Sequence, residues 1–263
     1  MAVEFRVLGP VEVVAGGRAL AVGGSRERAV LARLLVSANQ VVAQDCLVDD
    51  LWPGDVAQGG APAVQVYVSR LRKALRAAGG DEVLLTRPPG YQLAVDADAF
   101  DAARFETLVR AGRRSAADGR HAEAAATLAE ALALWRGPAY TGLTELPFAR
   151  AEAARLEEAR LGALEARLEA DLACGRDTEL IGELAALTGE HPLRERLWAL
   201  RITALYRAGR QAEALRTYQE LRRHLGEELG IDPSEELRAL EARILRQDAR
   251  LSRPPAQIGR AHV

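Results

Sequence analysis

After residue 97, a Gly-Arg dipeptide separates two stretches of helical apolar spacing at three positions, 119–120, 175–176 and 209–210. Glycine ends helices because it adopts the left-handed backbone without strain. Five residues after each glycine stands a residue that can pack at a helix crossing, and another apolar or aromatic residue follows four residues later. These pairs are Ala124 and Leu128, Leu180 and Leu184, and Ala214 and Tyr218. The pattern predicts stacked helical hairpins.

The spacing of the dipeptides indicates the kind of repeat. Gly209 follows Gly175 by 34 residues, the length of a tetratricopeptide repeat, and Pro192 falls between them, where such a repeat turns. The interval from Gly119 to Gly175 is 56 residues, so it contains an insertion, which we place around 136–147. Three units are enough to bury a continuous core.

The chain before residue 97 has a different character. Short strand-like segments come first, then three helical stretches, then a hairpin around a rigid tip. We expect strands at 3–8, 11–14 and 18–22, a first helix that follows Ser25, helices at 44–52 and 61–78, and hairpin strands at 83–86 and 91–95. Three helices followed by a hairpin are the arrangement of a winged helix.

The predicted fold class is mainly α, in two domains. An N-terminal winged helix-turn-helix (α+β) domain spans 1–96, and an all-α tetratricopeptide-like helical-repeat domain spans 97–250, followed by a flexible tail at 251–263. The composition agrees, because aromatic residues make up only 5% of the chain while alanine and leucine are abundant. Such a composition is typical of helix-on-helix packing rather than of a β-sandwich.

Capping residues mark two helix starts. Ser25 is expected to cap the first helix of the N-terminal domain. Asp232 is expected to cap the last helix, with Pro233 at the first helical position and Glu235 completing a capping box.

The N-terminus and the cysteines indicate the compartment. Glu4 and Arg6 interrupt the first apolar stretch, so we expect no signal peptide, and no run approaches the ~18 apolar residues of a membrane span. Cys46 and Cys174 lie far apart and are expected to be reduced, buried thiols. We therefore expect a cytoplasmic, nucleoid-associated protein without a membrane partner.

The helix expected at 61–78 has one apolar face and one basic face. Its core stripe consists of Val64, Val68, Leu71 and Leu75. The opposite face and its flank contain no acidic residue. They carry Gln65, Val66, Ser69, Arg70, Arg72, Lys73 and Arg76.

Net charge is distributed unevenly along the chain. The total is only −2, which taken alone argues against a nonspecific polyanion binder. Residues 60–92 nevertheless carry a net charge of +3, and residues 97–255 carry −3. A charge run is often no more than a solvated helix face. The absence of acids, and the hairpin that follows directly, favour contact with nucleic acid here.

A helix of this kind fits the major groove of DNA, where arginine donates two hydrogen bonds to guanine and an apolar side chain meets a thymine methyl. We assign Arg70 as the leading base reader and Val66 as the apolar contact. Ser69 and Gln65 are assigned as further polar readers.

The remaining donors are assigned to the DNA backbone, which sets register without reading sequence. Arg72, Lys73 and Arg76 are expected to contact phosphates. Thr86 and Arg87 lie at the hairpin tip, where Arg87 enters the minor groove or clamps a phosphate.

Signatures of catalysis or cofactor binding are missing from the sequence. The only lysine, Lys73, follows Arg72, so no G-x-x-x-x-G-K-[ST] loop exists, and G-x-G-x-x-G, G-x-S-x-G and C-x-x-C are absent as well. The four histidines lack metal-ligand spacing. We predict a protein that is not an enzyme and that uses no cofactor or metal.

Seven segments spread over residues 3–247 carry a resemblance to a known family. They are 5–10 (FRVLGP), 64–75 (VQVYVSRLRKAL), 85–91 (LTRPPGY), 133–138 (ALWRGP), 191–196 (HPLRER), 206–215 (YRAGRQAEAL) and 228–234 (ELGIDPS). With these segments in family order, the chain resembles the Streptomyces antibiotic regulatory protein (SARP) family. That family joins a response-regulator-type winged helix to a bacterial transcriptional activation domain.

The resemblance implies a sequence-specific transcriptional activator, usually of a secondary-metabolite (antibiotic) gene cluster. Such a protein binds direct repeats in double-stranded DNA near a promoter, as a homodimer on that DNA in one interpretation, and recruits RNA polymerase holoenzyme. The loop 53–61 would face polymerase. DNA contacts are implied at Gln65, Val66, Ser69, Arg70, Arg72, Lys73 and Arg87, with Ser69 departing from the basic residue of some relatives.

A second interpretation is a helical-repeat adaptor whose winged helix mediates protein–protein contacts. The two differ in salt dependence, since binding to DNA weakens steeply as salt is added. The helical domain could also sense a small ligand in the concave groove of its stacked hairpins, but no residue of the sequence singles out such a ligand.

Overall fold

The computed structural model describes residues 3–52, 60–80 and 82–251. The loop 53–59, most of the segment expected to face polymerase, and the tail 252–263 lie outside the described residues. The chain forms two compact units, Met1–Gly112 with Thr127–Leu164, and Arg113–Ala126 with Glu165–Val263.

The first unit begins with a small antiparallel sheet. Strands β1 (Val3–Arg6), β2 (Glu12–Ala15) and β3 (Arg18–Ala19) pair in that order. β1 buries Val3 and Phe5 and turns the charged residues between and after them outward, as a half-buried strand does. The third strand is shorter than expected, because its pairing with β2 ends at Ala19.

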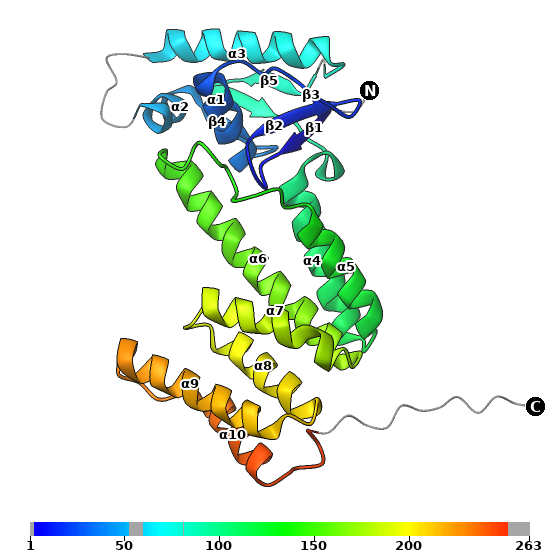
Figure 1. Ribbon diagram of the computed structural model, residues 1–263. Helices are drawn as coiled ribbons and strands as arrows, with labels where there is room; N and C mark the ends of the chain where they lie inside the picture. The colour runs from blue at the N-terminus through cyan, green and yellow to red at the C-terminus, as the bar shows by residue number, and fades with distance from the viewer. Residues whose placement is uncertain (1–2, 53–59, 81, 252–263) are drawn as a thin grey trace, which may run out of the picture. The chain divides into compact units, whose positions relative to one another are not determined.

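Three helices and a second sheet complete the N-terminal part (Figure 1). The helices are α1 (Ser25–Val36), α2 (Gln44–Leu51) and α3 (Gly60–Ala77), and the sheet has the order β4 (Val41–Ala43), β6 (Gly90–Leu93), β5 (Leu84–Arg87). All three helices pack on one another around a leucine-rich core. This is a winged helix, as predicted, with β5 and β6 as the wing. β4 is an addition to the prediction.

Two local predictions in this part are wrong. Ser25 does not cap α1, because it is already the first helical residue; the N-cap is Gly24, whose N–H donates to the Glu27 carboxylate at 3.0 Å. Cys46 is exposed rather than buried, because α2 turns Leu47, Val48 and Leu51 inward and Cys46 outward. Cys174 is half-buried.

The helical part follows after the short 3-10 helix η2 (Ala97–Ala99). Helices α4 (Asp101–Ala117), α5 (His121–Ala133) and α6 (Pro147–Ala173) each contribute residues to both units. The second unit adds α7 (Asp177–Glu190), α8 (Glu195–Arg207), α9 (Gln211–Leu229) and α10 (Glu235–Leu245). Figure 1 shows α7, α8 and α9 as successive antiparallel helices.

The Gly-Arg dipeptides form the same turn at all three positions. The glycines have φ of 77°, 80° and 77° at 119, 175 and 209, the left-handed conformation that ends a helix. The arginine N–H donates to the carbonyl five residues earlier, at 2.9 Å for Arg120, 3.1 Å for Arg176 and 2.9 Å for Arg210. The next helix begins directly afterwards. The helical-repeat prediction is confirmed.

Side chains named by the repeat pattern are the ones that pack. Ala124, Leu128, Leu180, Leu184, Ala214 and Tyr218 are all buried. In the second unit the core cluster runs through α8, α9 and α10. It contains Trp198, Ile202, Leu205, Ala214, Tyr218, Leu221, Leu225, Leu237, Ile244 and Leu251.

The predicted cap of the last helix is wrong. α10 begins at Glu235 with Ser234 at the N-cap position, so Asp232 lies outside the helix and pairs with Arg222 at 3.7 Å. The N–H of Ser234 donates instead to the Glu195 carboxylate, at 2.8 Å. A capping residue depends on where the chain leaves its extended conformation, which here is two residues later than the sequence suggests.

The predicted insertion connects α5 to α6 and belongs to the first unit. Its backbone binds the turn between β1 and β2: Arg136 N–H donates to Leu8 O at 2.8 Å, and Tyr140 N–H to Val7 O at 2.9 Å. Asp101, the first residue of α4, accepts the N–H groups of Val7 at 2.8 Å and Leu8 at 3.0 Å. The insertion binds the carbonyls of this turn and α4 binds its N–H groups, so both attach to the N-terminal sheet at Val7 and Leu8.

Candidate nucleic-acid interface

α3 presents the two faces that the sequence predicts. Val64, Val68, Leu71 and Leu75 are buried. The outward face carries the exposed residues Gln65, Val66, Ser69, Arg70, Lys73 and Arg76. Val66 is 46% exposed, an unusual position for a large apolar side chain in the middle of a helix. The structure brings these six side chains together on one surface, which we call the α3 face.

The wing lies beside α3 and is joined to it by Arg72. The Arg72 guanidinium donates from Nε to Leu84 O at 3.1 Å and from Nη2 to Thr86 Oγ1 at 3.0 Å. Arg72 is therefore half-buried, and it fixes β5 against the helix. Sequence reasoning assigned Arg72 to phosphate and Thr86 to the hairpin tip without finding this contact.

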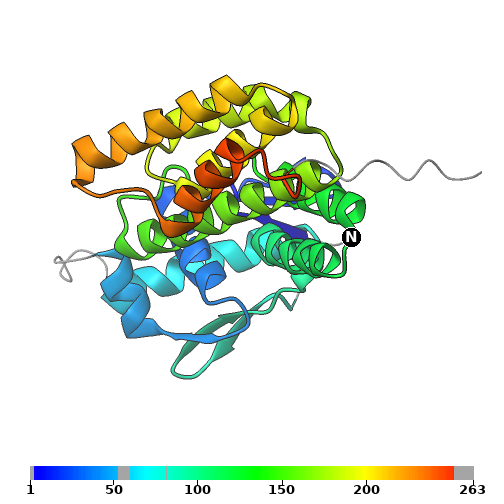
Figure 2. The same cartoon turned by 90° about the horizontal axis from the view of Figure 1, so that it is seen from below.

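The wing tip projects from the three helices, as Figure 2 shows. Arg87 is exposed at the end of β5 and pairs with Gly90 across the turn. Gly90 also pairs with Ala43 of β4, and the backbones approach so closely that a Cβ on Gly90 would lie 1.9 Å from Val42 O. Glycine at this position is what lets β4 anchor the wing.

Arg70 has a partner that sequence reasoning missed. Its Nη1 donates to Glu27 Oε1 at 2.8 Å, and the two side chains differ sharply in exposure, 65% for Arg70 and 8% for Glu27. The hydrogen bond from Arg70 lowers the pKa of Glu27 below its ordinary value. Glu27 is the third residue of α1, an end-capping position that a sequence can indicate, but nothing local points to Arg70.

The other exposed cations of the α3 face and the wing differ from Arg70 in their pairing. Across residues 3–52, 60–80 and 82–251, no ion pair involves Lys73, Arg76 or Arg87. These three charges are fully available to an anion. The face and the wing together offer exposed donors, one apolar side chain and no acid on the helix itself.

Two arginines of α1 contact α2 and its end, and an aromatic stack joins that end to α3. Arg26 donates to Leu51 O at 2.8 Å and lies over the Trp52 ring at 5.4 Å, while Arg33 pairs with Asp50. Trp52 in turn stacks on Tyr67 of α3, with ring centroids 6.3 Å apart. The helix that carries the basic face is thus packed against α1 and the end of α2.

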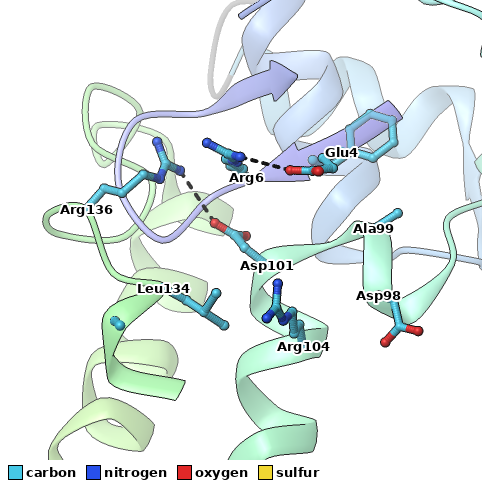
Figure 3. Close-up of a pocket in the computed structure, with 10 residues that line it drawn as sticks. Glu4, Arg6, Asp98, Ala99, Asp101, Arg104, Leu134 and Arg136 are labelled. Atoms are coloured by element: carbon cyan, nitrogen blue, oxygen red, sulfur yellow. Dashed lines mark hydrogen bonds and ion pairs between the residues drawn. The ribbon is translucent and has the colours of Figure 1, made fainter. Parts of the chain in front are cut away.

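A pocket of about 260 Å³ lies next to β1. Figure 3 shows its charged lining, with Arg6 paired to Glu4 and Arg136 to Asp101. Burial raises the pKa of Asp101, against the opposing effect of the Val7 and Leu8 amides. Four of its charged side chains pair with one another, so the pocket connects the sheet to the helices and offers few free groups to a ligand.

Other classes of site find little support. Among the described residues no group of histidine, cysteine, aspartate and glutamate is arranged to hold a metal ion. None of the helices in that same part of the chain is both long and apolar enough to span a membrane. The α3 face and the wing remain the best-formed candidate site.

Two family models match the chain. The model described as "Transcriptional regulatory protein, C terminal" matches residues 20–93, and the one described as "Bacterial transcriptional activator domain" matches residues 100–245. The first covers α1 to the wing, including the whole α3 face. The second covers α4 to α10.

Individual relatives carry similar names. The regulatory protein DnrI of Streptomyces peucetius is 37% identical over 257 residues, which are 95% of this chain and 94% of DnrI. The transcriptional regulatory protein EmbR of Mycobacterium tuberculosis is 42% identical over 246 residues, 93% of this chain and 63% of EmbR. The regulatory protein AfsR of Streptomyces coelicolor is 42% identical over 252 residues, 95% of this chain and 25% of AfsR.

A solved structure agrees with these sequences. Mycobacterium tuberculosis EmbR, in complex with a low affinity phosphopeptide, matches with a TM-score of 0.90 and 41% identity, over 93% of this chain and 65% of that chain. The chain thus spans less than two thirds of the length of EmbR. The names of these proteins are those of transcriptional regulators and not of enzymes, as predicted. With both domains matched and one relative covered almost completely, the chain belongs to the SARP family of transcriptional regulators.

Proposed function

We propose that the chain is a sequence-specific DNA-binding transcriptional activator that inserts α3 into the major groove and lays its wing on the adjacent backbone or minor groove. One observation carries the proposal: the α3 face has exposed cations and no acidic residue, directly beside an exposed arginine on the wing. Major-groove readers have this form, because arginine recognises guanine and a methyl-bearing side chain recognises thymine.

The proposed roles follow from exposure and pairing. Arg70 reads a guanine, Val66 contacts a thymine methyl, and Ser69 and Gln65 are polar readers of neighbouring bases. These four residues share the outward side of α3.

The remaining cations set position. Lys73, Arg76 and Arg87 bind phosphates or, for Arg87, the minor groove. Arg72 holds the wing through Leu84 and Thr86, and any phosphate contact would come from the donors left over.

The wider role is proposed from the family. We assign residues 1–96 to DNA binding, residues 97–250 to activation and residues 251–263 to a tail, and we expect action on the bacterial nucleoid in the cytoplasm. A regulator of this kind binds direct repeats, as a dimer on the DNA, and recruits RNA polymerase holoenzyme to a secondary-metabolite gene cluster.

A footprint tests the proposal. The purified chain is mixed at low salt with DNA from upstream of the genes adjacent to its own, and protection from nuclease is mapped. Two protected repeats about one helical turn apart would support it, since side-by-side binding on one face of the duplex has that spacing. Affinity should fall steeply with added salt.

Two outcomes speak against DNA binding. Absence of protection at low salt on every such fragment, and on fragments selected from a random library, would overturn it. Binding to a protein partner through the α3 face, without DNA affinity, would favour the adaptor interpretation instead.

A further inference from the structure

Glu27 binds two parts of the winged helix with its two carboxylate oxygens. Oε2 accepts the N–H of Gly24 at 3.0 Å, which caps α1, and Oε1 accepts Nη1 of Arg70 at 2.8 Å, which holds a side chain of α3. One buried group therefore joins the start of α1 to the middle of the α3 face.

The loop before α1 encloses the Glu27 side chain. Gly23 adopts φ of +95°, and a Cβ at this position would lie 2.8 Å from Cγ and 2.9 Å from Cβ of Glu27. The chain thus packs against the methylene groups of Glu27 and restricts the rotamers that its carboxylate can adopt. Only 8% of the side chain is exposed. The anchor for Arg70 is fixed before any ligand arrives.

Arg70 itself remains open to a ligand. A guanidinium has five N–H donors, and among the described residues this one gives a single bond, from Nη1. With 65% of the side chain exposed, the other donors are accessible to a ligand. In the described residues, no other acidic side chain forms an ion pair with a cation of the α3 face. A pair this exposed at one end contributes little to folding stability. Its geometry is better explained by the orientation that it gives to Arg70.

We propose that Glu27 is a positioning residue for base recognition, which holds the Arg70 guanidinium in the one orientation that reaches its base pair. This inference rests on the proposed function. An unrestrained arginine samples many rotamers and reaches several neighbouring bases, whereas a fixed one loses less entropy on binding and reaches one. Glu27 would thus determine specificity without touching DNA.

A double-mutant cycle measures the effect. An operator is first selected from a random library with the wild-type chain. Dissociation constants are then measured for that operator and for every single base-pair change in it, with wild type, E27Q, R70A and the double variant. Glutamine is the sharpest substitution, because its amide oxygen still accepts the Gly24 N–H while its neutral amide no longer attracts the guanidinium.

In E27Q, the ratio of dissociation constants between the changed and the selected operator should fall about tenfold. This decrease should occur at the same base pair at which R70A lowers the ratio. Discrimination at the other base pairs should be unchanged. In the R70A background, E27Q should have no further effect, since the two act through one contact. E130Q is the matched control, because it removes a carboxylate that pairs with Arg104 at 2.8 Å in the helical part, and it should leave every base preference as in wild type.

Thermal unfolding and circular dichroism check that E27Q folds. If it does not, E27D keeps the charge and retracts the carboxylate from Arg70, and the same relaxation is expected. If the variants at Glu27 lose affinity equally for all sequences, Glu27 acts only as a helix cap. If they gain affinity equally, its charge only repels DNA. Either result would overturn the proposal. So would relaxation at a base pair different from that of R70A.

The cycle separates the two proposals. If wild type discriminates and R70A relaxes one position while E27Q relaxes none, only the role of Glu27 fails. If wild type shows no sequence preference at all, the proposed function fails, and the role of Glu27 fails with it.

Discussion

Helices α3 and α9 resemble each other in packing and differ in charge. Each is a long amphipathic helix with a buried stripe: Val64, Val68, Leu71 and Leu75 in α3, and Ala214, Thr217, Tyr218, Leu221 and Leu225 in α9. The exposed side of α9 mixes arginines and glutamates, whereas α3 carries four cations and no acid. In both helices the apolar stripe determines which face is buried. The exposed faces differ in their charge.

The two helices also differ in how their exposed arginines are paired with carboxylates. On α9 and at its start, two exposed arginines have a carboxylate partner close by in sequence or in space, Arg210 in Glu213 and Arg222 in Asp232. Within the described residues, the one acidic partner of an α3 cation is Glu27 of another helix. Arg72 binds the wing, and Lys73 and Arg76 are exposed. Balanced charge is typical of a solvated helix. A helix face that carries several cations and no acid indicates a surface that binds an anion.

The largest effect should follow from moving the wing. Gly90→Ala places a Cβ against the Val42 carbonyl at 1.9 Å, so the β4–β6 pairing must open. We expect a loss of about 3 kcal/mol or more of stability, with loss of DNA binding. Denaturant unfolding and a binding titration measure both.

The matched glycine is in the helical part. Gly209→Ala meets nothing within 4 Å and strains only a φ of +77°, which costs about 1 kcal/mol. Its DNA binding should stay as in wild type. Similar losses for the two variants would contradict the steric role of Gly90.

The next effect is on base recognition. Arg70→Ala should relax preference at one base pair by about 1–3 kcal/mol, because a bidentate guanine contact is lost. Titration with operators changed at single positions measures it. Arg216→Ala, an exposed arginine of α9, should change no preference. Unaltered affinity and preference in Arg70→Ala would refute its assignment.

Much of the fold was predictable because it is periodic. The three Gly-Arg turns repeat one backbone geometry, and the residues at fixed distances after them are buried. Strand β4 was not predictable from the sequence, because its three residues are too few to show the alternation of a strand. The caps at Ser25 and Asp232 failed for a related reason: suitable side chains stand near both helix starts, and only the backbone decides which one is used.

The sequence predicts which residues of α3 are exposed, but not which residues they contact. A helical wheel places Arg70 and Lys73 outward, because burial of α3 follows its own sequence. The partners of Arg70 and Arg72 lie 43 and 14 residues away, and depend on how α1 and β5 pack on α3. Sequence reasoning identifies donors more readily than it identifies what restrains them.

A smaller effect should appear in salt dependence. Lys73→Gln and Arg76→Gln each remove one phosphate contact, so each should lower the slope of log affinity against log salt by about 0.9 and weaken all sequences alike. Arg216→Gln and Arg223→Gln remove equal charge from the exposed side of α9. They should leave the slope unchanged. An equal decrease in both pairs would mean that net charge, and not the α3 face, attracts DNA.

The smallest effect is on stability and pH, and it compares Glu27 with Glu213. The pKa of each is lowered by a hydrogen bond from an arginine, Arg70 or Arg210. A carboxylate whose folded pKa is lowered stabilises the protein above its unfolded pKa, and this contribution disappears as pH falls through the folded value. The stability difference between wild type and E27Q, or E213Q, should therefore be constant at neutral pH and shrink below the ordinary glutamate pKa of 4.5. Denaturant unfolding from pH 3 to 7 measures it. Only E27Q should also change base preference at neutral pH, because only its arginine belongs to the α3 face; a change with E213Q would remove the distinction between the two helices.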